Sequence, residues 1–332
     1  AAPIQRWSRA SHEHSNPGAL FPRRMAPRAP FHPAEMDPHT DYPQWKQRVR
    51  YDSSACDGEL VLLLGPAGAG KSQFWTQALA GHVPQAPGSS VAAAAIDWSA
   101  FVSLDGDEMR EIHAGFCARR RELGQQGSAA ASTCGGHACN GTSSLQTSSQ
   151  EAHGEWLHDC KQLHEAMKPV TARFKKLIIS RGIEERAPRG RNFAVPLTFS
   201  TPDAYEWLAQ FREAGYCVRV VVVLVAPFDV VTARVTQRAQ RDAALQTMTR
   251  QKYDMAFSGI KEALNGALWG SQDSSALCVP SERGVRILVI DSSKDGVHRL
   301  LLDVDAHPDA DASTRTAWLT TLQCILNDFE HQ

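Results

Sequence analysis

The sequence lacks an excess of either charge, a long apolar run and a regular array of cysteines. Its 35 basic and 36 acidic residues leave a formal net charge of −1, so it has no basic footprint of the kind that binds nucleic acid or anionic membranes. The longest apolar stretch, Val220–Pro227, is far shorter than the roughly 20 residues of a membrane-spanning helix. We therefore expect no nucleic-acid partner and no membrane partner.

The eight cysteines are scattered, and a chain of 332 residues can bury a full core without disulfides. Their distribution indicates a reducing compartment, and we expect a cytoplasmic protein. Cys134, His137 and Cys139 are close in sequence, but their spacing fits no zinc motif and no second ligand pair accompanies them. We interpret them as thiols and an imidazole in a low-complexity segment.

Two segments are predicted not to fold. Residues 1–57 are rich in Pro, Arg, His and Ser, and we interpret them as a disordered leader. An arginine excess is also typical of a mitochondrial presequence, although the prolines oppose the amphipathic helix that such a signal needs. Residues 124–150 are almost uncharged and predict a flexible insertion. We expect residues 58–332 to form one domain that contains this insertion.

Strand and helix patterns alternate through that domain. Strands are predicted at Leu60–Leu64, Phe101–Leu104, Leu177–Ile179, Val218–Ala226 and Arg286–Ile290. Helical patterns cover residues 72–80, 156–174, 205–214, 228–241, 252–268 and 314–329, with a kink expected at Pro169. Strands separated by helices predict an α/β fold, with a mostly parallel five-stranded sheet in the middle of three layers.

The most specific motif is a glycine-rich segment between the first predicted strand and a helix. Its residues are Gly65, Pro66, Ala67, Gly68, Ala69, Gly70, Lys71 and Ser72, which match G-x-x-x-x-G-K-[ST]. In such a loop the glycines let backbone N–H groups point at phosphate oxygens, and the following helix presents its positive end. Lys71 is expected to reach the β- and γ-phosphates, and the Ser72 hydroxyl to bind Mg²⁺. The sequence therefore predicts binding of ATP or GTP.

Two absences narrow the class of nucleotide-binding protein. No Asn-Lys-x-Asp motif occurs, so a GTPase that reads guanine is excluded. A motor or AAA-type ATPase would carry an apolar strand that ends in Asp-Glu, and the nearest match, Ile287–Asp291, is followed by Ser292. A kinase is the favoured class.

Two groups of charged residues support this choice. Asp105 and Asp107 follow the second predicted strand, where they suit a base for a hydroxyl proton and a group that holds Mg²⁺. Arg234, Arg238 and Arg241 share one face of a predicted helix, which suits a transferring phosphate. The alternatives are an acidic turn that caps a helix and a solvated basic face.

Over about residues 58–300 the sequence resembles the zeta-toxin family of phosphate-loop kinases. The likeness is carried by the loop and by four later segments: Leu104-Asp105-Gly106-Asp107 with Arg110 and His113; Gly215-Tyr216-Cys217-Val218; Thr236-Gln237-Arg238; and Val289-Ile290-Asp291-Ser292 with Lys294. Two insertions interrupt it, at residues 124–150 and near residues 183–204. The resemblance implies a P-loop NTPase fold similar to nucleoside-monophosphate kinases.

The resemblance also implies roles for particular residues. Lys71 and Ser72 would handle ATP and Mg²⁺, Asp107 would be the general base, and Arg238 would stabilise the transferred phosphoryl group. Asp291 would lie near the adenine, and the substrate side would include Asp105, Arg110, His113 and Arg191. Because bacterial members phosphorylate UDP-N-acetylglucosamine, the implied acceptor is a small-molecule hydroxyl, with a nucleotide sugar as the leading class.

Several positions depart from the family pattern. Ser180 follows the predicted third strand, where the family has the glutamate of a Glu-Gly-Thr segment; Glu184 or Glu185 is a candidate replacement. Arg191 with Val195-Pro196 is a candidate for the downstream arginine and Val-Pro pair. The second catalytic arginine has two candidates, Arg241 and Arg250, and Ala114 replaces a proline.

These departures leave two alternatives open. One is another small-molecule or nucleic-acid-end kinase of the same fold, and the other is a non-catalytic ATP-binding protein with a degenerate acceptor site. A toxin role would predict an antitoxin-like partner that covers the loop, and the sequence indicates none.

The loop motif gives a direct test. The Lys71→Ala variant is expected to lose phosphoryl transfer, because no other side chain in the motif carries a positive charge to the phosphates. Transfer of label from [γ-³²P]ATP measures this, and turnover near that of the unchanged chain would contradict the assignment of Lys71.

Overall fold

The computed structural model describes residues 31–49, 57–84, 96–134, 144–184, 191–199, 203–242, 248–269, 281, 283–307 and 309–332. Residues His32–Gln332 form one compact unit, which contains the sheet and every element named below. No helix within the described residues is long and apolar enough to cross a membrane.

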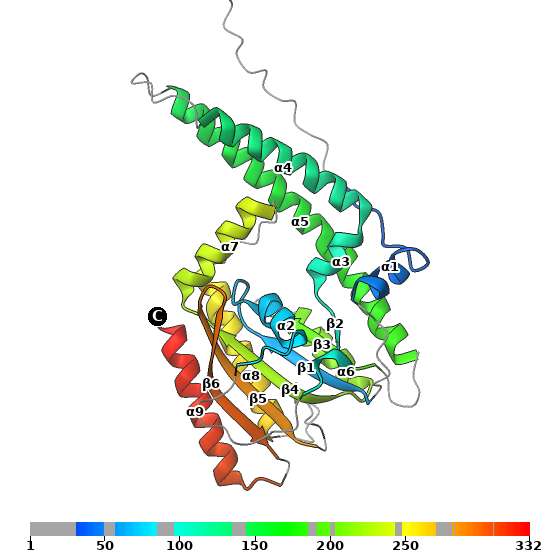
Figure 1. The fold of residues 1–332 in the computed structure, drawn as a ribbon, viewed down its shortest axis with the longest axis vertical. Helices are drawn as coiled ribbons and strands as arrows, with labels where there is room; N and C mark the ends of the chain where they lie inside the picture. The colour runs from blue at the N-terminus through cyan, green and yellow to red at the C-terminus, as the bar shows by residue number, and fades with distance from the viewer. Residues whose placement is uncertain are drawn as a thin grey trace, which may run out of the picture. The chain divides into compact units, whose positions relative to one another are not determined.

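The described strands form one sheet in the order β2-β3-β1-β4-β5-β6 (Figure 1). They are β1 (Glu59–Leu64), β2 (Val102–Ser103), β3 (Phe193–Leu197), β4 (Cys217–Val225), β5 (Val285–Lys294) and β6 (Val297–Ala306). The first five are parallel, and β6 joins the edge antiparallel to β5. Strand β1 lies between β3 and β4, so the loop that follows it leaves from the interior of the sheet.

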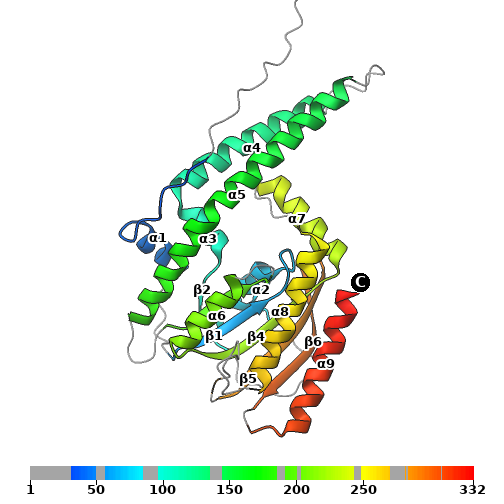
Figure 2. The same ribbon diagram turned by 180° about the vertical axis from the view of Figure 1, so that it is seen from behind.

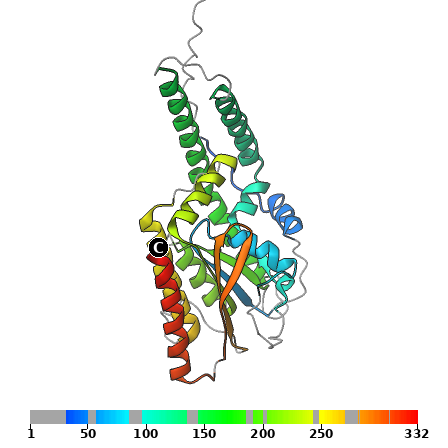
Figure 3. The ribbon, with the colours of Figure 1, turned by 60° about the vertical axis from the view of Figure 1, so that its left-hand side comes forward.

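Helices cover both faces of this sheet. They are α1 (Asp41–Arg48), α2 (Lys71–Leu79), α3 (Gly106–Ile112), α4 (Ala114–Cys134), α5 (Ser144–Glu184), α6 (Asp203–Glu213), α7 (Phe228–Asp242), α8 (Arg250–Trp269) and α9 (Ala312–Glu330), with a 3₁₀ turn at Trp98–Ala100. Helix α2 lies on one face, and α6, α8 and α9 lie on the other, as Figures 1 and 2 show from opposite sides. Figure 3 shows α2 and the pair α8–α9 on either side of the strands.

The apolar runs of the sequence explain this layering. Every residue of β1 is buried, and so are the last six of β4, because both strands are covered on two faces. On the α2 side, Phe74 and Trp75 pack in one buried cluster with Val61, Leu63 and Val222. The predicted α/β fold with a mostly parallel sheet is therefore confirmed.

Two strands differ from the prediction. Leu177–Ile179 is not a strand: it belongs to the 41-residue helix α5, which runs through Pro169, and its apolar residues continue the buried face of that helix. The third strand is Phe193–Leu197, inside the predicted second insertion. Its Pro196 is tolerated because β2 pairs only with Phe193 and Ala194, so β3 is an edge strand at the proline. With β6, which the apolar pattern did not indicate, the sheet has six strands rather than five.

The described part of the predicted leader is folded. Residues 32–49 include α1, whose Tyr42 and Trp45 are buried. The Arg181 guanidinium of α5 lies 4.6 Å from the centre of the Tyr42 ring, and Arg173 of α5 pairs with Glu35. The interpretation of a disordered leader is therefore wrong for these residues, and the other leader residues lie outside the described part, apart from Phe31 and Asp57.

The predicted insertion is flanked and partly occupied by helix. Helix α4 continues to Cys134 and α5 begins at Ser144, and the two helices run side by side (Figure 1). The flexible-insertion prediction is wrong for these helical residues, while residues 135–143, with His137 and Cys139, lie outside the described part. Among the described residues, no group of three or more His, Cys, Asp or Glu side chains is arranged to hold a metal.

Close packing after β3 yields a stability prediction. A Cβ atom at Gly259 of α8 would lie 2.4 Å from Cβ of Phe199, which is fully buried. We expect Gly259→Ala to lower the free energy of unfolding by about 1–3 kcal/mol, because the overlap involves the base of a side chain that cannot swing away. The neighbouring exposed Ser258→Ala is the matched control. Equal denaturation midpoints for the two variants would contradict this packing.

Candidate active site

The glycine-rich loop connects β1 to α2 and is built around left-handed backbone. Gly68 and Gly70 have φ angles of +88° and +86°, which a side chain would strain. A Cβ atom at Gly68 would also lie 2.8 Å from the carbonyl oxygen of Val231 on α7. The loop is therefore held close to α7, and Gly70 caps the N-terminus of α2.

The Lys71 side chain folds back over this loop. Its Nζ donates hydrogen bonds to the carbonyl oxygens of Gly65, at 2.7 Å, and Pro66, at 3.0 Å. Burial, opposed by the Asp105 carboxylate and assisted by the nearby Arg238, lowers the pKa of Lys71 to about 7. The loop therefore holds a buried amine that a bound anion would favour in its charged form.

Asp105 and Ser72 meet at the start of α2. The Ser72 hydroxyl donates a 3.0 Å hydrogen bond to Oδ2 of Asp105, while Oδ1 accepts one from the backbone N–H of Asp107 at 2.9 Å. Asp105 thus caps α3, as one of the alternatives proposed, and at the same time faces the loop. A hydroxyl beside a carboxylate is an oxygen donor set that suits Mg²⁺.

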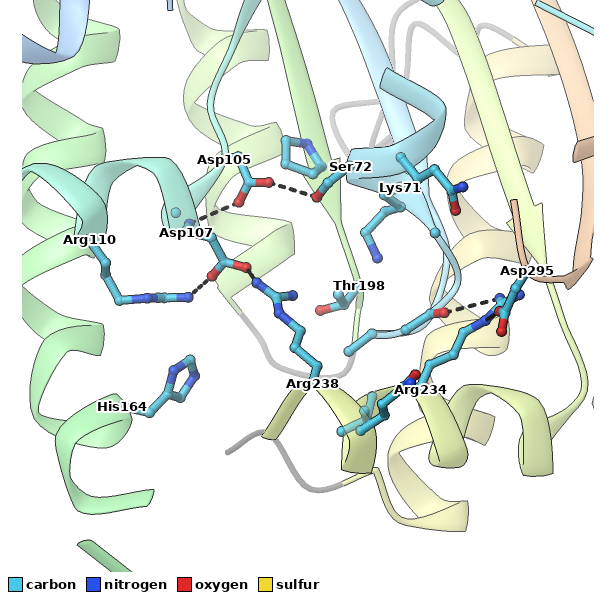
Figure 4. Close-up of a pocket in the computed structure, with 18 of the residues that line it drawn as sticks. Lys71, Ser72, Asp105, Asp107, Arg110, His164, Thr198, Arg234, Arg238 and Asp295 are labelled. Atoms are coloured by element: carbon cyan, nitrogen blue, oxygen red, sulfur yellow. Dashed lines mark hydrogen bonds and ion pairs between the residues drawn. The ribbon is translucent and has the colours of Figure 1, made fainter. Parts of the chain in front are cut away.

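Asp107 lies between two guanidinium groups. Oδ1 pairs with Arg110, one turn along α3, and Oδ2 pairs with Arg238, which comes from α7 (Figure 4). Arg234, one turn before Arg238, donates to Oδ1 of Asp295 at 2.7 Å and to the carbonyl oxygen of Gly68 at 3.4 Å. Helix α7 therefore directs two of its three predicted arginines at the site, while the side chain of Arg241 is outside the described part.

These groups line one cavity of about 680 Å³. Its walls are the loop and the start of α2, the end of β3 beside the loop, helix α3, helix α7 and the turn between β5 and β6, with a far wall from α5. The lining residues are Ala67, Gly68, Gly70, Lys71, Ser72, Gln73, Asp105, Gly106, Asp107, Arg110, His164, Lys175, Pro196, Thr198, Arg234, Val235, Gln237, Arg238, Asp295 and Gly296. This volume is within the range of small-molecule sites.

Other predicted site residues lie outside this lining. His113 is buried and structural: its Nδ1 accepts from the N–H of Phe116, and its Nε2 lies 3.0 Å from the carbonyl oxygen of Ala34. Asp291 accepts from Ser293 and Arg299 at the β5–β6 turn. Arg191 precedes β3, at the end of the strand opposite the loop.

The structure also changes which residues stand at the positions where the chain departs from the family pattern. Ser180 is an exposed residue within α5, so it cannot correspond to the residue after the third strand. That position belongs to Thr198, directly after β3, and Thr198 lines the cavity. Arg250 lies 5.5 Å from the centre of the Phe228 ring and pairs with Asp254, away from the cavity lining.

Three cavity residues were not among those that the sequence indicated. His164, which is only 5% exposed, lines the cavity, as do Lys175 and Thr198. His164 and Lys175 are eleven residues apart, or three helical turns, and so they share a face of α5. That spacing would have indicated that both residues lie on one helix face, but the prediction ended the helix at residue 174 and began a strand at Leu177.

Comparison with known proteins finds only distant similarities. No family model and no curated protein matches it. Similar solved structures include a chain of the PezAT chromosomal toxin–antitoxin system of Streptococcus pneumoniae, at 12% identity and TM-score 0.44, covering 90% of this chain and 99% of that one. Another is a chain of the AvrRxo1-ORF1:AvrRxo1-ORF2 complex with sulphate ions, at 13% identity and TM-score 0.38, covering 84% of this chain and 68% of that one.

These findings correct one expectation. The sequence indicated a small-molecule partner and no antitoxin-like protein, whereas the two similar structures belong to a toxin–antitoxin system and to a complex of two proteins. The class of fold follows from the chain itself: a glycine-rich loop between a buried inner strand and a helix, in a mostly parallel sheet covered on both faces, defines a P-loop NTPase fold.

The lowered pKa of Lys71 predicts a pH dependence of nucleotide affinity. Without ligand the amine loses its proton above about pH 7, and a bound triphosphate would restore it. We therefore expect ATP affinity to fall as the pH rises from 7 to 9, by up to about tenfold per unit. Calorimetry should show proton uptake on binding at pH 8. Lys71→Met should remove both effects, and an unchanged affinity from pH 7 to 9 would contradict them.

Proposed function

We propose that the chain is an ATP-dependent phosphotransferase that moves the γ-phosphate of ATP to a hydroxyl group of a small molecule. The observation that carries this proposal is the position of Asp107. Its carboxylate lies in the same cavity as the phosphate loop, between the loop side and the α5 wall, and it pairs with Arg110 of its own helix and with Arg238 of α7 (Figure 4). A carboxylate there suits removal of an acceptor proton.

The residues present fit ATP and Mg²⁺. The left-handed loop would accept the phosphates, and the buried Lys71 amine, which donates to the carbonyl oxygens of Gly65 and Pro66, lies at the same loop. Ser72 and Asp105 would hold Mg²⁺, which when bound neutralises charge on the β- and γ-phosphates. Lys71, Arg234 and Arg238 would supply the remaining positive charge around the triphosphate.

The chain's own residues suggest an order of events. In the described structure Arg238 occupies one oxygen of Asp107, so the carboxylate cannot receive a proton at that atom. An incoming γ-phosphate competes for Arg238, because a guanidinium fork binds phosphate at least as well as a carboxylate. Release of Arg238 exposes Oδ2 to the acceptor hydroxyl, which gives up its proton as its oxygen bonds to phosphorus and the bond to ADP breaks.

The acceptor class rests on the sequence resemblance, which implies a nucleotide sugar such as UDP-N-acetylglucosamine. Thr198 stands where that family carries a glutamate, so the acceptor would be held here by a neutral hydroxyl at this position. The second candidate, a non-catalytic ATP-binding protein, is favoured by this same substitution. We also propose a cytoplasmic location.

A panel assay separates these functions. Label from [γ-³²P]ATP is followed onto UDP-N-acetylglucosamine, other sugar nucleotides, free sugars and nucleosides. Labelled product on any hydroxyl acceptor supports the kinase. Tight ATP binding without product on the whole panel would favour the non-catalytic alternative.

The two aspartates should have separable roles. Asp107→Asn removes the proton-accepting carboxylate, and we expect kcat to fall about 10²–10⁴-fold while ATP affinity changes little. Asp105→Asn, the matched comparison two residues away, should instead raise the Mg²⁺ concentration that half-maximal rate requires, because Asp105 faces Ser72. If Asp107→Asn turns over at close to the rate of the unchanged chain, Asp107 is not the general base.

A further inference from the structure

The far wall of the cavity contains a buried polar group that phosphate binding does not use. His164 projects from α5 on the same side as Arg110, while Lys71 and Ser72 lie on the other side and Asp107 and Arg238 lie between them (Figure 4). A phosphoryl group that leaves the loop toward Asp107 therefore moves toward this wall. Whatever receives it has to lie between Asp107 and α5.

One ring nitrogen of His164 lacks a hydrogen-bond partner. The residue is 5% exposed, and its Nδ1 is buried without a hydrogen-bond partner among the described residues. Leaving such an atom unpaired costs roughly 1–3 kcal/mol, so buried polar atoms without partners are rare and call for an explanation. The neighbouring buried positions of the same helix, Leu163 and Met167, are apolar, and they show that an apolar residue is accommodated beside it.

The imidazole is also uncharged at neutral pH. Burial, together with Lys168 on the same helix and Lys252 on α8 and against the effect of Glu165, lowers the pKa of His164 to about 4. An uncharged ring among cationic side chains binds by hydrogen bonding rather than by charge. Its natural counterpart is a neutral polar group, such as a hydroxyl or amide.

We infer that His164 is an acceptor-binding residue, whose ring nitrogen hydrogen-bonds a hydroxyl or amide group of the molecule that receives the phosphate. This inference rests on the proposed function. Lys175, three turns further along the same face of α5, belongs to the same wall, and its Nζ lies 5.4 Å from the centre of the Trp207 ring. Thr198, at the end of β3, lines the cavity beside the loop, because β3 pairs with β1 as far as Leu197 and Leu64. An acceptor against the α5 wall would therefore meet the uncharged imidazole first.

The test compares His164→Leu, which removes the hydrogen bond, with His164→Gln, which keeps one, using the panel acceptor that the unchanged chain phosphorylates fastest. His158→Leu, at an exposed position of α5, is the matched control. We expect His164→Leu to raise the acceptor KM about 5–10-fold, with ATP affinity and the KM for ATP unchanged. His164→Gln should recover most of the loss, and His158→Leu should match the unchanged chain.

A measurement on the unchanged chain covers the case in which His164→Leu does not fold. With ¹⁵N-labelled histidine, the ring signal that disappears in His164→Gln is assigned to His164, and it should shift when the acceptor is added. A signal that does not shift, or an unchanged acceptor KM in a folded His164→Leu, would overturn this inference and leave the proposed function standing. If the unchanged chain phosphorylates no panel member, the proposed function fails first, and the inference falls with it.

Discussion

The ion pair between Asp107 and Arg238 joins two sides of the cavity. One side is α3, which carries Asp107 and its second partner Arg110, and the other is α7, which carries Arg238. Neither helix forms part of the sheet, so their separation depends on contacts between side chains rather than on strand hydrogen bonds. A pair that bridges two such elements fixes the width of the space between the loop and the α5 wall. The same pair occupies the groups that a phosphate and an acceptor would need.

The loop side is fixed in a different way, by main-chain contacts with the sheet. Ser292 at the end of β5 is buried, and its hydroxyl lies 2.7 Å from the carbonyl oxygen of Ala69 and 3.1 Å from that of Val225. One hydroxyl proton is therefore shared between the loop and β4. This explains why the strand that resembled an Asp-Glu ATPase strand continues with a serine. On its other side the loop lies close to α7, at Gly68 against Val231 and through the side chain of Arg234.

Much of the central fold was predictable, because β1, β4 and the loop have local signals. Continuous apolar runs fix the strands, and the spacing from Gly65 to Ser72 fixes the turn. Strand β3 was not predictable in the same way. It is five residues long and contains Pro196, so it has no local signature, and it is recognised only by its pairing with β1.

The error at β3 carried over into the site. With Leu177–Ile179 as the predicted strand, Ser180 occupied the position that belongs to Thr198. The partners of His113 and Asp291 could not be predicted for another reason: a motif gives the order of residues along the chain, but the partner of a side chain depends on the fold. In this chain those partners include the carbonyl oxygen of Ala34 for His113, and Ser293 of β5 and Arg299 of β6 for Asp291.

Helix α5 links two regions that are distant in the sequence. Near its C-terminal end Arg173 and Arg181 contact Glu35 and Tyr42, and His164 lies 17 residues before Arg181, or about 25 Å along the helix axis. The helix continues through Pro169 over that length, so the two regions are joined by unbroken helix. The segment that precedes the glycine-rich loop in the chain therefore serves as an anchor for the opposite wall, and trimming the N-terminal region back to the first strand would leave that wall without its fixed end.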